Sequence, residues 1–122
     1  MKFVSIDHIQ LSMPVGGEDK ARAFYVGLLG LTEIAKPPEL AKRGGAWFEQ
    51  GDVKLHIGSE EDFHALRKAH PALIVDDLAA LIARLQNSGC DVDTTQPPLA
   101  GFTRVHVLDP FGNRLELMEK LG

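Results

Sequence analysis

The clearest alternation of apolar and polar residues lies near the C-terminus, over residues 103–118. The run Asp109-Pro-Phe-Gly112 interrupts it with the composition of a type I turn, so the segment predicts a β-hairpin. Because side chains on a strand point alternately to its two faces, the apolar and polar residues fall on opposite faces. The apolar face, which we expect to be buried, carries Val105, Val107, Leu115 and Leu117, and the polar face carries Arg104, His106, Arg114 and Glu116. The polar face is either a chemical site or a solvated outer surface.

Hydrophobic periodicity elsewhere predicts two helices and six further strands. The first helix spans residues 18–29 and stops at Gly30, and the second begins at Asp76-Asp77 and stops at Gly89. Strands are expected over residues 3–13, 31–35, 46–50, 53–57, 70–75 and 90–94. Residues 37–45, which begin with two prolines, predict a loop, and residues 59–69 predict a linker in which Ser59 is suited to cap one helical turn.

The order of these elements repeats along the chain. His8 in the first strand corresponds to His70, and Leu55-His56-Ile57 corresponds to Leu115-Glu116-Leu117. Two copies are too few for a solenoid, so we expect one paired sheet system. The prediction is a single α+β domain over residues 1–122, with module one at 1–58, a linker at 59–69 and module two at 70–122. Two βαβββ modules would then form a curved mixed sheet around a cleft.

Composition limits the number of domains, the cellular compartment and the class of partner that we expect. The 122 residues suffice for one core, and the single cysteine, Cys90, excludes an internal disulfide and fits a reducing compartment. No apolar run approaches the ~20 residues of a membrane span, and the N-terminus lacks a signal-peptide pattern, so we expect a cytoplasmic protein. A net charge of −4 without a basic stripe argues against nucleic acid as the partner.

The repeat also places four candidate metal ligands. Each module carries one in its first strand and one in its last, His8 with His56 and His70 with Glu116. If the concave faces of the modules meet, three imidazoles and a carboxylate converge, a set that suits Zn, Ni, Co, Fe(II) or Mn better than Ca or Mg. An octahedral ion held by four protein groups keeps two adjacent positions for a substrate with neighbouring oxygens. Taken alone, each residue is more often a hydrogen-bonded histidine or a solvated glutamate, but their joint placement favours a metal site.

Four segments carry a resemblance to a known family. They are Ile6-Asp-His8-Ile, Ala23-Phe-Tyr25 followed by Leu29-Gly-Leu31, the run from His70 to Leu78, and the run from Asp109 to Glu116. As a set they are specific, and the whole chain resembles the vicinal oxygen chelate superfamily. Its members include glyoxalase I, fosfomycin-resistance thiol transferases, methylmalonyl-CoA epimerase, extradiol dioxygenases and the metal-free bleomycin-resistance proteins. The resemblance implies a glyoxalase-like fold and, for a chain of this length, a symmetric homodimer whose site draws on both chains.

The family's metal positions fall on the same four residues, His8, His56, His70 and Glu116. His56 stands where glyoxalase I-like enzymes usually have Glu or Gln, so the chain departs from that pattern there. The resemblance also makes Glu116 a catalytic base as well as a ligand. Three further residues are candidates for binding substrate: Arg104, His106 and Trp47. The alternatives are simple exposure for Arg104 and His106 and core packing for Trp47.

Several functions stay open for this set of residues, because the fold alone does not determine function. The first hypothesis is a metal-dependent lyase or isomerase of glyoxalase type, acting on a small substrate with vicinal oxygens. The second is a metal-free binding or resistance protein that holds an apolar or cationic drug. A fosfomycin-type thiol transferase and an Fe(II) dioxygenase are further alternatives, although a fourth protein ligand, His56, would crowd the positions that oxygen and a catechol need.

Overall fold

The computed structural model describes residues 1–122, which form two compact units, Met1–His64 and Ala65–Gly122. Each unit contains one four-stranded mixed sheet and at least one helix. The predicted α+β class is therefore confirmed. The grouping into one domain with modules at 1–58 and 70–122 and a linker at 59–69 stays a prediction.

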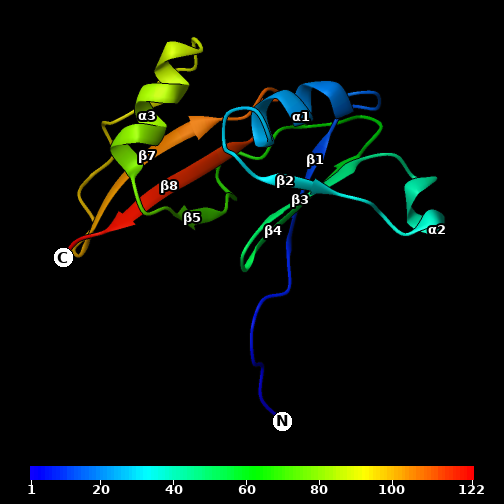
Figure 1. Ribbon diagram of the computed structural model, residues 1–122, viewed down its shortest axis with the longest axis horizontal. Helices are drawn as coiled ribbons and strands as arrows, with labels where there is room; N and C mark the ends of the chain where they lie inside the picture. The colour runs from blue at the N-terminus through cyan, green and yellow to red at the C-terminus, as the bar shows by residue number, and fades with distance from the viewer. The chain divides into compact units, whose positions relative to one another are not determined.

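The first unit follows a βαβββ order with one short extra helix. Its elements are β1 (Ile9–Met13), α1 (Glu18–Tyr25), β2 (Thr32–Ile34), α2 (Pro38–Ala41), β3 (Ala46–Gln50) and β4 (Val53–Ser59). The strand order is β1-β4-β3-β2, with β1 parallel to β4 and the other pairs antiparallel. Helix α1 lies along this sheet (Figure 1) and buries Ala21, Phe24 and Tyr25. The sheet supplies Leu11, Phe48, Leu55 and Ile57 to the same core.

The second unit repeats this topology. Its elements are β5 (Ala72–Ile74), α3 (Leu78–Asn87), β6 (Val92–Asp93), β7 (Phe102–Leu108) and β8 (Arg114–Lys120), and the strand order is β5-β8-β7-β6. Strand β5 is parallel to β8, as β1 is to β4. Asp77 caps α3 by accepting a hydrogen bond from Ala80 N, and Leu85 of α3 is fully buried. The predicted repeat of βαβββ units is confirmed.

The hairpin β7–β8 has two buried faces rather than one. Val105, Val107, Leu115 and Leu117 are at most 4% exposed, as the alternation predicts. On the opposite face His106 and Glu116, which are register partners, are only 6% and 7% exposed. Simple solvation therefore does not account for these two polar residues, and their contacts need a chemical explanation.

The strand predicted over residues 3–13 begins only at Ile9. Its parallel partner β4 starts at Val53, and Ile9 already pairs with Leu55, so the segment before Asp7 extends beyond the start of β4 and has no partner there. In Figure 1 this N-terminal segment leaves β1 and runs away from the sheet. Phe3 and Val4 are consequently more than 90% exposed.

Three other boundaries differ from the prediction. Helix α1 ends at Tyr25, and the next residues form wider turns in which Gly27 N and Leu29 N bond to carbonyls five residues back. The expected loop at residues 37–45 contains α2, because Pro38 at the first helical position needs no partner for a missing N–H. No helical turn follows Ser59, which instead ends β4.

Gly45 marks a close approach of two backbones at the start of β3. Its φ is +86°, and a Cβ built there would lie 2.5 Å from Ile57 O. Gly51, in the β3–β4 turn, has a φ of +56° with nothing within 4 Å of its Cβ position. We expect Gly51→Ala to lower the free energy of unfolding by about 1 kcal/mol, from the left-handed backbone alone. Gly45→Ala, which adds a steric clash, should cost about 2 kcal/mol.

Urea denaturation of both variants beside the wild type measures this difference. Equal losses for Gly45→Ala and Gly51→Ala would show that the approach to Ile57 O relaxes without cost.

Candidate functional site

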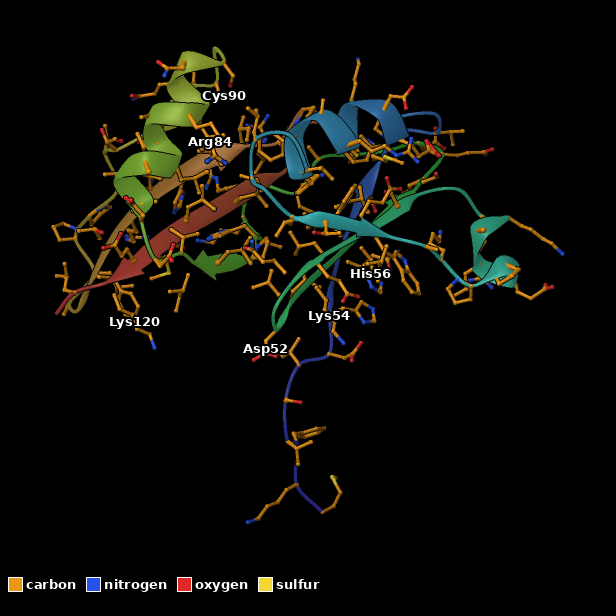
Figure 2. All side chains as sticks on the ribbon, in the orientation of Figure 1. Asp52, Lys54, His56, Arg84, Cys90 and Lys120 are labelled. Carbon is orange, nitrogen blue, oxygen red and sulfur yellow. The ribbon has the colours of Figure 1, made fainter.

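Three aromatic rings stack on the polar face of the first sheet. Trp47 of β3 and His56 of β4 are register partners, and their rings are nearly parallel with centroids 4.0 Å apart. His8, just before β1, covers the other side of His56 at 4.0 Å. His56 projects from β4 together with Lys54 (Figure 2), and it is 7% exposed. Trp47 therefore lies against a candidate ligand rather than within the apolar core.

The stacked arrangement affects how His8 and His56 could bind a metal ion. Burial lowers the pKa of His56, and the neighbouring His8 lowers it further, so His56 is neutral at neutral pH and keeps a lone pair. The lone pairs of an imidazole lie in its ring plane, and the planes of His8 and His56 differ by only 17°. Coordination of one ion by both rings therefore requires His8, whose side chain is 39% exposed, to turn.

The second unit brings together two predicted ligands, His70 and Glu116, and His106, which the sequence suggested only for substrate binding. His70 Nε2 lies 3.2 Å and His106 Nε2 3.6 Å from Glu116 Oε1. One ligand atom from each residue lies within 4.8 Å of the others. Separations of this size fit donor atoms that each bind one ion at about 2 Å.

The hydrogen bonds of His70 indicate what lies between it and Glu116. His70 Nδ1 lies 2.9 Å from the carbonyl oxygen of Lys68, an acceptor, so Nδ1 carries the proton. His70 Nε2 faces the carboxylate oxygen Glu116 Oε1 at 3.2 Å. Either a proton on Nε2 makes this contact a hydrogen bond, or a cation between the two atoms makes them a pair of metal ligands. The contact thus fits a metal ligand pair, with Lys68 O orienting the ring from behind.

Glu116 is held as an anion by its neighbours. Burial is the largest single effect and raises its pKa, but the contact with His70, the hydrogen bond from Arg104 and the nearby positive charge lower it more in sum, so the pKa lies below its ordinary value. Arg104 Nη1 donates to Glu116 Oε2 at 3.2 Å and Nη2 donates to Pro97 O at 2.6 Å. Arg104 therefore positions one oxygen of Glu116 and leaves the other facing the two histidines.

His106 is the least satisfied polar group of this cluster. Both of its ring nitrogens are buried without a hydrogen-bond partner, and its side chain is only 8% exposed. Burial lowers the pKa of His106, against the opposing effect of Glu116, so the ring is neutral at neutral pH. A buried nitrogen without a partner costs free energy, which a bound metal or substrate would recover.

The turn between β7 and β8 is hydrogen-bonded to the segment that leads to His70, and so helps to position the cluster of His70, His106 and Glu116. Asn113 is fully buried, and its Oδ1 accepts a hydrogen bond from Leu66 N at 3.1 Å. Asp109 accepts from Phe111 N, from Asn113 N and from Asn113 Nδ2 at 2.9 to 3.0 Å. Arg114 N in turn donates to Leu66 O, so the chain that leads to His70 is tied to the start of β8. From the sequence this segment was predicted as a turn and as part of a family motif, but its support of the chain before His70 was not predicted.

The predicted site residues thus form two groups, each inside one unit. His8, Trp47 and His56 lie together in the first unit. His70, Arg104, His106 and Glu116 lie together in the second. The four-ligand metal site itself stays a prediction. None of α1, α2 and α3 has the length and apolar surface that crossing a bilayer requires.

Known structures resemble the chain along nearly its whole length. A glyoxalase family protein from Bacillus anthracis is 43% identical with a TM-score of 0.90, and the match covers 99% of this chain and 98% of that one. A glyoxalase family protein from Enterococcus faecalis is 23% identical with a TM-score of 0.76, covering 98% of this chain and 100% of that one. None of the curated proteins matches the chain.

The fosfomycin resistance protein FosX from Listeria monocytogenes, in a structure with Mn(II) and sulfate, is 15% identical. Its TM-score is 0.77, and the match covers 98% of this chain and 93% of that one. At this identity the likeness shows the fold alone.

The family comparison agrees with these structures. The model of the Glyoxalase/Bleomycin resistance protein/Dioxygenase superfamily matches residues 5–117. The resemblance predicted from sequence motifs is confirmed, because this match includes all four motif segments. The chain belongs to the Glyoxalase/Bleomycin resistance protein/Dioxygenase superfamily.

Proposed function

We propose that the protein is a metal-dependent enzyme of glyoxalase type, a lyase or isomerase for a small substrate with vicinal oxygens. His8, His56, His70 and Glu116 are its proposed metal ligands. The observation that carries the proposal is the contact of His70 Nε2 with Glu116 Oε1 at 3.2 Å, in which two acceptors need a cation or a proton between them.

The donor set narrows the choice of metal. Imidazole nitrogens and one carboxylate suit Zn, Ni, Co, Fe(II) or Mn. FosX from Listeria monocytogenes, which shares the fold, has been solved with Mn(II). The proposal requires the pair His8–His56 and the pair His70–Glu116 to reach the same ion, within one chain or across a dimer.

Glu116, Arg104 and His70 of the second unit each have a separate role in the proposed reaction. A bound divalent ion would polarise the substrate oxygens as a Lewis acid. Glu116 takes up a proton at the substrate carbon and returns it, and its lowered pKa keeps it ionised for this task. Arg104 holds Glu116 Oε2, so that Oε1 alone faces the reacting centre. Lys68 O keeps His70 in the tautomer that ligates through Nε2.

Elemental analysis tests the metal centre. Untagged wild-type protein, purified without added metal, should contain close to one equivalent of a divalent transition metal, and His70→Ala should lose it. His56→Ala reports whether the first unit contributes a ligand. His64→Ala is the matched control, because His64 is exposed and bonds only to Asp62 O. Wild-type protein that is metal-free and also fails to bind added Zn, Ni or Fe(II) would refute the proposal.

A second candidate is a metal-free protein that binds a drug. The stack of Trp47, His56 and His8 favours it, because a flat aromatic surface binds apolar and cationic ligands. Trp47 is the single tryptophan of the chain and reports such binding by its fluorescence. Affinity for bleomycin that survives chelator treatment would favour this function over the first.

The remaining parts of the proposal concern the setting of the enzyme. We propose a symmetric homodimer in the cytoplasm, as the resemblance to short family members implies. Thiol transfer and oxygen-dependent ring cleavage are the reactions to assay next if lyase and isomerase substrates fail.

A further inference from the structure

A cavity of about 260 Å³ lies in the second unit beside the ligand cluster. Its lining contains the charged or polar residues Arg67, Asp91, Asp93, His106 and Arg114, together with Val92 of β6 and Val107 and Leu108 of β7. His106 belongs both to the lining of this cavity and to the ligand cluster, since its Nε2 lies 3.6 Å from Glu116 Oε1. A molecule that reaches the proposed ligands His70 and Glu116 therefore has this cavity next to it.

The cationic groups of the cavity have no partners within the protein. The guanidinium groups of Arg67 and Arg114 make no hydrogen bond or ion pair, and the Arg114 side chain is half-buried. Both ring nitrogens of the 92% buried His106 are unsatisfied as well. A guanidinium presents paired N–H donors that match the oxygens of a carboxylate or phosphate. The unmet donors of the cavity thus suit an oxyanion.

Two acidic groups, Asp91 and Asp93, also line the cavity, and neither pairs with Arg67 or Arg114. The side chains of Thr95 and Gln96 and the backbone N–H of Thr95 donate to Asp93, and they lower its pKa to about 2. Its oxygens are therefore directed to the loop after β6 rather than to Arg67 or Arg114. The carboxylates of Asp91 and Asp93 both reduce the affinity for anions, so we expect weak binding of a free anion.

We propose that this cavity is the subsite for an anionic group of the substrate, a carboxylate or a phosphate-type oxyanion bound by Arg114, Arg67 and His106. This inference rests on the proposed function, because it assumes that the rest of the substrate lies at the metal ligands. It restricts the substrate class to acids whose anionic end lies a short distance from the vicinal oxygens.

Anion binding to metal-free protein tests the subsite without relying on the metal. Chelator-treated wild type at pH 7.5 is titrated with inorganic phosphate and, separately, with malonate, with chloride keeping the ionic strength constant. We expect saturable changes in the ¹⁵N–¹H signals of the His106 ring and of Arg114 Nε. The dissociation constant should rise about tenfold in Arg114→Gln, because a charge-assisted pair is lost. The tighter of the two anions identifies the chemistry.

Two further variants control the experiment. Arg84→Gln removes the same charge from α3, where Figure 2 labels Arg84, and should leave anion binding unchanged. Arg114→Lys retains the charge without the planar fork and should bind with intermediate affinity. No saturable change with either anion, or equal affinity in wild type and Arg114→Gln, would overturn the inference. Failure of anion binding would not affect the proposal of a metal site. Likewise, a wild-type protein without metal in elemental analysis would not affect the result of the anion titration.

Discussion

Glu116→Gln should lose the bound metal and lower turnover by a factor of about 10³ while the protein stays folded. Glutamine keeps the size of glutamate and can still accept the hydrogen bond from Arg104, so packing of this 7% exposed side chain is preserved. The amide carries no charge to attract a cation, and its basicity is too low to take up a proton. Metal content, turnover with a vicinal-oxygen substrate and thermal unfolding are measured on the same preparation.

Glu60→Gln serves as the control for this variant. Glu60 is exposed and lies just after β4, so the same chemical change there should leave metal content and turnover unaltered. A Glu116→Gln protein that retains its metal and most of its turnover would contradict both proposed roles of Glu116. Retained metal with lost turnover would separate the roles and leave Glu116 as a base only.

Asn113→Ala should lower the free energy of unfolding by about 3 kcal/mol. Asn113 is fully buried, and its side chain joins two otherwise separate segments, since it accepts from Leu66 N and donates to Asp109 Oδ2. Truncation leaves a buried N–H and a buried carboxylate oxygen each short of one partner. Urea unfolding followed by circular dichroism measures the loss.

Asn87→Ala is the matched control for Asn113→Ala. Asn87 is the last residue of α3 and is exposed, so its truncation should change stability by less than about 0.5 kcal/mol. Asn113→Ala should also weaken metal binding, because Leu66 leads the chain to His70. A loss of stability below about 1 kcal/mol would show that the turn retains its geometry without this side chain.

Much of the fold could be predicted because its signals are local. The alternation over residues 103–118 placed Val105, Val107, Leu115 and Leu117 on one face, and these four side chains are buried as expected. Pairing of β3 with β4 and of β7 with β8 follows from turns of a few residues. The prediction of a strand before Ile9 was wrong because a strand needs a partner, and the parallel partner β4 starts only at Val53.

The sequence predicted which candidate site residues lie together in pairs, but it did not predict the hydrogen bonds that orient them. The repeat placed His8 with His56 and His70 with Glu116, and each pair does lie together within its unit. The tautomer of His70 depends on Lys68 O, a backbone atom that no pattern of side chains reveals. The hydrogen bond from Arg104 to Glu116 was likewise not predicted, since the sequence left Arg104 either to bind substrate or to be simply exposed.

The sequence by itself determined most of the elements, their repeat and the family, and it supplied candidate metal ligands, because periodicity and motifs depend on neighbours along the chain. Only the tertiary structure decided that His106 and Glu116 are buried, that His106 lacks partners and that a cavity with unpaired arginines adjoins them. The physical reason is that burial and hydrogen bonding are set between residues far apart in sequence, such as His70 and Glu116, which are 46 positions apart.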